Sequence, residues 1–136
     1  MNFDLTNREF RLLLDLVYIG NWVLNSARGT DRIEEYDKLM EKIFSFSPKA
    51  GMDSLVQPGK NSPGPSRAYE EGGIHDAIAD YEDSVFFDIL AEELARRDMN
   101  IDSVSADNVT ELASRIEEYI SEFEENGVEN ISIDLP

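Results

Sequence analysis

The only histidine in the chain opens an acidic stretch, HDAIADYEDSVFFD, that covers residues 75–88. Histidine and carboxylate groups together can bind zinc, iron or manganese, so a metal site here would combine His75 with Asp76, Asp80 or Asp83. The apolar residues between these acids repeat at helical spacing and require the buried side of the same helix. The acids therefore face solvent, and we predict that His75 is exposed or stands at a helix start, without a metal.

Nucleophilic catalysis has no support in the sequence. The chain contains no cysteine, and no serine occupies the Gly-x-Ser-x-Gly pattern of a nucleophile elbow. His75 is the one candidate base, but no residue is marked as the partner that would orient its ring. Residues 59–66, GKNSPGPS, faintly resemble a phosphate-binding loop, yet Asn61 stands where that loop needs serine or threonine.

Two pairs of acids have the spacing that a magnesium-dependent hydrolase could use, Glu34 with Asp37 and Glu122 with Glu125. The all-α nucleoside-triphosphate pyrophosphatases direct clustered carboxylates into a groove, where they hold magnesium around a phosphate chain. Most of these acids lie on the solvent side of their predicted helices, and Asp37 alone lies near the boundary. We therefore predict no catalytic, metal-binding or cofactor-binding residue, and we keep a small hydrolase of this kind as the alternative.

The negative charge is concentrated in one half of the chain, whose net charge is −17. Residues 1–67 hold nine acids and nine bases, whereas residues 68–136 hold twenty acids and three arginines. Such a charge repels nucleic-acid phosphates, so we predict no direct nucleic-acid binding. It would attract a basic protein, and mimicry of nucleic acid is a special case of that interaction. Plain solubility would produce the same pattern.

The outward acids of the second half form the candidate interaction surface. They stand opposite the apolar faces of two predicted helices, which places them in solvent. The candidate residues are Asp88, Glu92, Glu93, Glu111, Glu117, Glu118, Glu122 and Glu125. The sequence thus favours a non-enzymatic interaction domain, a monomer or a homodimer, with an acidic surface for a basic partner.

Length and composition set the class of protein. A chain of 136 residues with 41% apolar residues is sufficient for one domain with one core, residues 1–136. The absence of cysteine excludes disulfides and fits a reducing, cytoplasmic setting. The N-terminus has no basic cluster before an apolar run, so we expect no signal peptide. The most apolar stretch, residues 12–24, contains Asp15 and is too short to span a bilayer, so we expect no membrane partner.

Two helices are expected in the first third of the chain. Thr6 and Glu9 have the spacing of a capping box, which starts a helix that runs to Asn25 or Arg28. Its apolar residues cover almost the whole circumference, so we expect it to be the central helix of the fold. A second helix, with one apolar face, is expected over residues 30–46.

Proline and glycine dominate residues 47–73, which we predict to be one long loop. Residues 47–66 should be the most mobile internal segment, because few of their side chains can be anchored. In the helix that follows, the apolar face rotates by about 100°, and one straight helix cannot bury both faces against one core. We therefore predict a break at residues 82–84. Of the adjacent Phe86 and Phe87, one ring should be exposed or cover a second helix.

The last helix should begin between residues 105 and 107 and end at Gly127. Residues 3–5 and 131–135 alternate apolar and polar side chains, as short strands do, and their pairing would join the two termini. The predicted fold is mainly α, with four to five helices around the central N-terminal helix. A minor two-stranded β element from the termini completes it.

Three segments follow one another along the chain: LTNREFRLLLDLVYIGNWVLN, YEDSVFFDILAEELARRD and EFEENGVENISI. In these segments the chain resembles a family of small acidic bacterial proteins of unknown function. The likeness covers most of the chain outside residues 47–73 and consists of apolar patterns with helix caps. It implies a bacterial, soluble, mainly helical protein. It brings no activity and no functional residues.

Overall fold

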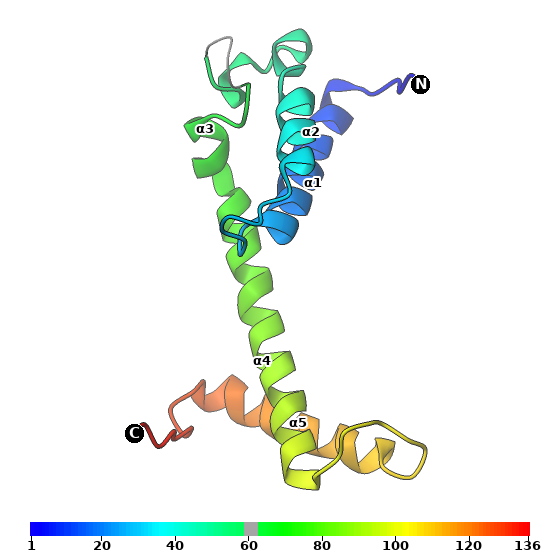
Figure 1. Ribbon diagram of the computed structural model, residues 1–136, viewed down its shortest axis with the longest axis vertical. Helices are drawn as coiled ribbons and strands as arrows, with labels where there is room; N and C mark the ends of the chain where they lie inside the picture. Colours follow the sequence, from blue (N-terminus) through cyan, green and yellow to red (C-terminus); the bar gives the residue numbers. More distant parts are fainter. Residues whose placement is uncertain (59–62) are drawn as a thin grey trace. The chain divides into compact units, whose positions relative to one another are not determined.

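The computed structural model describes residues 1–58 and 63–136, which are mainly helical, as predicted (Figure 1). The elements are α1 (Asn7–Asn25), α2 (Glu34–Phe44), the 3₁₀ turns η1 (Ser47–Ala50) and η2 (Asp53–Leu55), α3 (Arg67–Tyr69), the π turn η3 (Glu70–Ile74), α4 (His75–Met99) and α5 (Val109–Asn126). Where the sequence predicts one domain, the chain divides into two compact units, Met1–Ile78 and Ala79–Pro136. Each has buried residues of its own, and they are called the first and the second unit below.

The start of α1 is fixed by the predicted capping box. The Thr6 amide donates to the Glu9 carboxylate at 2.8 Å, and the Glu9 amide donates to the Thr6 hydroxyl at 3.2 Å. These bonds satisfy amides that have no partner inside the helix. The bonds that the Thr6 amide and hydroxyl donate to the Glu9 carboxylate hold the pKa of Glu9 below its ordinary value. The helix ends at Asn25, the earlier of the two predicted ends.

The described residues do not show α1 as the central helix, packed by neighbours on several sides, that the sequence predicts. One side packs into the core of the first unit, which consists of Leu14, Tyr18, Phe44, Tyr69, Ile74 and Ile78. Leu12, Leu16 and Val23 lie outside this core and are between 55% and 70% exposed. A helix that is apolar all round needs neighbours on every side, and the first unit supplies them on one side.

α2 begins at Glu34, later than predicted, because a buried side chain occupies the backbone before it. Asn25 is fully buried, and its amide group donates to the Ile33 carbonyl at 3.0 Å. The same group accepts from the Ile33 amide at 2.8 Å. Both bonds hold Ile33 in an extended conformation, so the helix starts after it. Asn25 thereby ties the end of α1 to the start of α2.

Residues 47–73 are not the single loop that the sequence predicts. Their described parts contain η1, η2, α3 and most of η3, and an antiparallel bridge pairs Val56 with Pro65. Ser66 is buried and its hydroxyl accepts from the Tyr69 amide at 3.2 Å, which starts α3. The Tyr69 ring is then 1% exposed in the core. Prolines and glycines prevent long elements, but they favour the short turns found here.

Residues 59–62 lie outside the described part of the chain. The phosphate-loop comparison at Asn61 falls there. The predicted mobility of residues 47–66, which include this gap, stays a prediction.

The helix break lies at Gly73 and not at residues 82–84. Gly73 has a φ of 109°, a left-handed value that other residues rarely adopt, and it interrupts η3 just before α4. α4 then runs unbroken to Met99. The sequence argument assumed one core, but Ile78 is buried in the first unit and Ala91 in the second. Because there are two cores, one unbroken helix can supply apolar residues to both.

The second unit has a small core, whose buried apolar residues are Ala91, Ala95, Leu112 and Phe123. Phe87 packs on Phe123 with ring centres 5.4 Å apart, whereas Phe86 is 52% exposed, which confirms the prediction for this pair. α5 ends at Gly127, as predicted, where the amide donates to the Phe123 carbonyl at 2.9 Å.

The predicted pairing of the termini is absent from the described residues. Residues 1–6 and 131–136 contain no strand there, and the bridge between Val56 and Pro65 is local to the first unit. Two short strands alone are at best marginally stable in water, and these two belong to different units. Within the same described ranges, no helix is long and apolar enough to cross a membrane.

Candidate functional site: a pocket in the first unit

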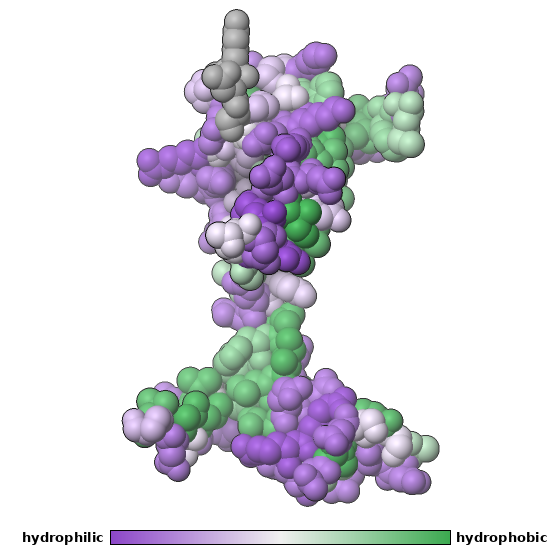
Figure 2. All heavy atoms as spheres, viewed as in Figure 1, coloured by the Kyte–Doolittle hydropathy of each residue, from purple (hydrophilic) through white to green (hydrophobic). Residues whose placement is uncertain are grey.

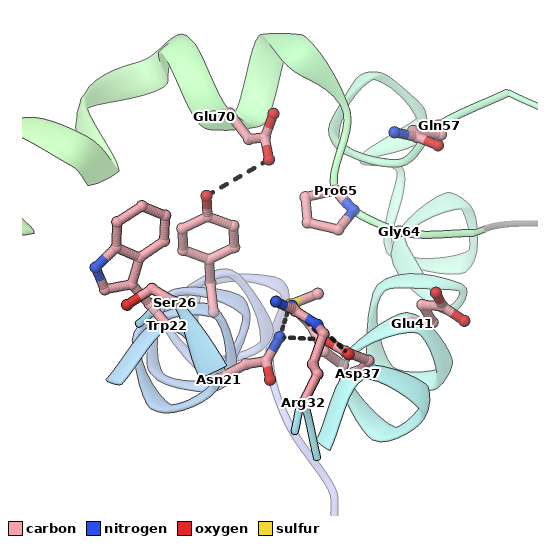
Figure 3. A pocket seen from close by; sticks show the side chains of 12 residues that line it. Asn21, Trp22, Ser26, Arg32, Asp37, Glu41, Gln57, Gly64, Pro65 and Glu70 are labelled. Carbon is pink, nitrogen blue, oxygen red and sulfur yellow. Dashed lines mark hydrogen bonds and ion pairs between the residues drawn. The ribbon is translucent and has the colours of Figure 1, made fainter. Parts of the chain in front are cut away.

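A pocket of about 560 Å³ opens in the first unit between α1, α2 and four residues that follow them, Gln57, Gly64, Pro65 and Glu70 (Figure 3). Its wall exposes about as much apolar as polar surface, with aromatic side chains supplied by α1. The lining residues are Tyr18, Asn21, Trp22, Ser26, Arg32, Asp37, Met40, Glu41, Gln57, Gly64, Pro65 and Glu70. Pockets of this volume accommodate small organic ligands.

An ion pair forms one side of the pocket. Arg32 donates to both carboxylate oxygens of Asp37, at 2.6 Å and 2.7 Å, and the Asn21 amide donates to the same carboxylate at 2.9 Å. The bonds from Arg32 are the main cause that holds the pKa of Asp37 below its ordinary value. Asn21 also accepts from Asn25, so this network continues into the tie between α1 and α2.

Tyr18 connects α1 to the residues on either side of the break at Gly73. Its hydroxyl oxygen lies 2.7 Å from His75 Nε2 and 3.5 Å from a carboxylate oxygen of Glu70. The longer contact is weak, so His75 is the main partner of the hydroxyl. Burial raises the pKa of Tyr18 to about 12, and the charge of Glu70 adds to this effect. Tyr18 therefore stays neutral near pH 7.

His75 is the first residue of α4, as predicted, but its ring is not simply solvated. The ring is half-buried and packs edge-on against Trp22, with ring centres 4.9 Å apart. Asp76 and Asp80 are exposed, as the helical periodicity predicts. The sequence reasoning missed the partners of His75 because they lie on α1, and Tyr18 precedes it by 57 residues.

The acid pairs considered for a hydrolase form no joint metal site in the described residues. Glu34 forms an ion pair with Lys38 at 3.2 Å, and Asp37 forms one with Arg32 at 2.6 Å. Glu122 accepts from Asn126 at 3.1 Å, and Glu125 is exposed. The two pairs also belong to different units. Across residues 1–58 and 63–136, no group of three or more histidines and acids is arranged to hold a metal ion.

All eight acids of the predicted interaction surface belong to the second unit, and six of them are exposed. Glu92 and Glu93 line a hollow of about 650 Å³ together with two arginines. Glu118 and Glu122 line a smaller hollow of about 180 Å³. Four of the eight acids therefore line two different hollows, each of which also contains arginine.

No protein-family model matches this chain, and comparisons with curated proteins and with solved structures give no significant match. The resemblance to small acidic bacterial proteins stays a prediction. The function has to be inferred from geometry and charge.

Proposed function

We propose that the protein is a non-enzymatic interaction domain whose second unit offers an acidic surface to a basic partner protein. The charge of residues 79–136, which hold seventeen acids against three arginines, carries this proposal. The first unit holds twelve acids and nine bases, so the excess is confined almost wholly to one unit. A charge localised in this way attracts a basic partner and orients it before contact.

The three arginines of the second unit leave most of this charge uncompensated. Each already pairs with an acid of its own unit, at N–O distances between 2.7 Å and 3.2 Å. Among the described residues, five acids of the candidate surface form no ion pair and accept no hydrogen bond: Asp88, Glu93, Glu117, Glu118 and Glu125. Their full charge is available to a partner.

Apolar side chains are exposed among these acids. Phe86 is 52% and Ile89 is 57% exposed, both on the part of α4 that belongs to the second unit. Figure 2 shows apolar surface beside hydrophilic surface within this unit. Protein interfaces combine apolar anchors with a polar, charged rim. The partner that fits this surface therefore presents basic and apolar side chains together.

The proposal extends to the setting and the kind of partner. The absence of cysteine and the resemblance noted above support a bacterial, cytoplasmic protein. The partner class includes proteins that bind nucleic acid, because an acidic surface can occupy their basic sites. Direct binding to nucleic acid is opposed by the charge of the second unit.

The test compares two variants of equal net charge. One neutralises three acids of the second unit, and the other neutralises three exposed acids of the first unit. They are Glu117→Gln/Glu118→Gln/Glu125→Gln and Asp4→Asn/Glu35→Gln/Asp53→Asn. All six acids are exposed, so neither variant should disturb folding.

Each immobilised protein is incubated with a bacterial lysate, and retained proteins are identified by mass spectrometry at low and high salt. We expect the unmodified protein to retain basic proteins. The second-unit variant should retain less of them than the first-unit variant, which is the control. Their retention should weaken as salt rises, because exposed charges are screened beyond about 10 Å at 0.1 M. Equal retention by both variants, or retention that salt does not weaken, would contradict the proposal.

A further inference from the structure

Independently of the acidic second unit, we propose that the pocket of the first unit binds a small organic cation with a guanidinium or alkylammonium group. Among the described residues that line the pocket, the acids outnumber the bases. They are Asp37, Glu41 and Glu70 against Arg32. Its aromatic side, on α1, suits the carbon chain of such a ligand.

Arg32 does not make this a site for anions. Both of its bonds to Asp37 are short, at 2.6 Å and 2.7 Å. A bidentate ion pair of this kind is among the strongest that arginine forms. An anion would have to disrupt that pair and would then face two further carboxylates. With the pair intact, the charge left to the pocket is that of Glu41 and Glu70.

Glu41 and Glu70 are the acceptors that we assign to the ligand. Glu41 is half-buried on α2 and, within the described ranges, forms no ion pair and accepts no hydrogen bond. Glu70 receives the 3.5 Å contact from Tyr18, which is too long to be strong. Among the described residues, these two carboxylates of the pocket therefore lack strong donors, and a cationic group supplies donors and charge together.

The two carboxylates come from different elements and frame the space between them. Figure 3 shows Glu41 and Glu70 on two sides of the pocket, with Gln57 and Pro65 between them along the wall. Trp22 lies beyond Glu70 on the aromatic side. A guanidinium or ammonium group between the carboxylates has enough donors for both, and its carbon chain lies toward the aromatic side.

Trp22 is the only tryptophan of the chain, so its fluorescence reports on the pocket directly. The probes are n-butylguanidinium and n-butylammonium, titrated at an ionic strength kept constant with sodium chloride. Butyrate, an anion with a carbon chain of similar length, is the control ligand. We expect a saturable change with the two cations and none with butyrate.

Two double variants locate the effect. Glu41→Gln/Glu70→Gln removes both charges from the pocket, and Glu35→Gln/Glu71→Gln removes two charges from exposed positions on the same elements, α2 and η3. We expect the first to raise the Kd about tenfold or more, because it removes two charge-assisted bonds. The second should change the Kd by less than about threefold. Circular dichroism checks that both variants are folded.

A capped tripeptide, acetyl-Gly-Arg-Gly-amide, distinguishes two sources of the cation. Binding as tight as that of n-butylguanidinium assigns the pocket to a basic side chain of another protein, and binding of the free cations alone assigns it to a small molecule. The proposal is overturned if no cation gives a saturable change, or if butyrate binds as well as the cations. Equal weakening by the two double variants would also overturn it.

Discussion

The two units of this chain are stabilised in different ways. The first unit buries the rings of Tyr18, Phe44 and Tyr69 in one cluster and carries twelve acids against nine bases. The second unit buries two alanines, one leucine and one phenylalanine, and carries seventeen acids against three bases. Stability in the first unit therefore depends on a packed interior, whereas the second combines a small interior with strong repulsion at its surface.

Buried polar residues follow the same division. In the described chain they are Asn21, Asn25, Ser47 and Ser66, and all belong to the first unit. The side chains of Asn21, Asn25 and Ser66 have hydrogen-bond partners at fixed positions, so they specify how the elements around them are placed, whereas the Ser47 hydroxyl has no partner among the described residues. In the first unit such bonds fix part of the lining of the pocket, where the buried Asn21 donates to Asp37. A charged docking surface, as proposed for the second, requires much less.

The largest expected effect tests the packed interior of the first unit. Leu14 is fully buried, so Leu14→Ala should lower the free energy of unfolding by about 2–5 kcal/mol, because it leaves a cavity. Leu16 on the same helix is 70% exposed, and Leu16→Ala should cost less than about 0.5 kcal/mol. Denaturant unfolding followed by Trp22 fluorescence measures both variants. Similar losses would show that this side of α1 does not carry the stability of the unit.

Leu14 and Leu16 also show how far the fold could be predicted from the sequence. The capping box at Thr6 and the end of α5 at Gly127 were predicted correctly, because every group that determines them lies within a few residues. Whether a leucine of α1 is covered depends on elements far along the chain. Helical periodicity treats both leucines alike, and so it predicted a central helix that the described residues do not show.

The candidate site shows the same limit. Periodicity correctly predicted that Asp76 and Asp80 face solvent, since the outward direction of a helical side chain is a local property. It could not place His75 against Trp22, because that contact joins α1 to the start of α4 across the short turns of residues 47–73. Those turns also bring Gln57 and Glu70 to the pocket. A sequence reading that treats them as one loop cannot find the pocket.

A smaller effect should follow when the polar tie between α1 and α2 is removed. Asn25→Ala eliminates two bonds to the Ile33 backbone and one to Asn21. The half-buried backbone of Ile33 then lacks partners, which should lower the free energy of unfolding by about 1–3 kcal/mol. Hydrogen exchange of the Ile33 amide should accelerate in the same variant. Ser26→Ala, at the exposed position next along, is the control, and an unchanged Ile33 amide in Asn25→Ala would argue against the tie.

The smallest expected effect separates the units by their charge. Raising sodium chloride from about 0.01 M to about 1 M shortens the screening length from about 30 Å to about 3 Å, which weakens repulsion among the acids of the second unit. The amides of α5 should then exchange more slowly, by a factor that corresponds to less than about 1 kcal/mol. In the first unit acids and bases nearly balance, so attraction and repulsion are screened together and α1 should change less.

The variant Glu117→Gln/Glu118→Gln/Glu125→Gln should reduce the response of α5, because part of the repulsion is already gone. If α1 and α5 respond equally, salt is acting on apolar burial in general, and the charge of the second unit has no measurable influence on its stability.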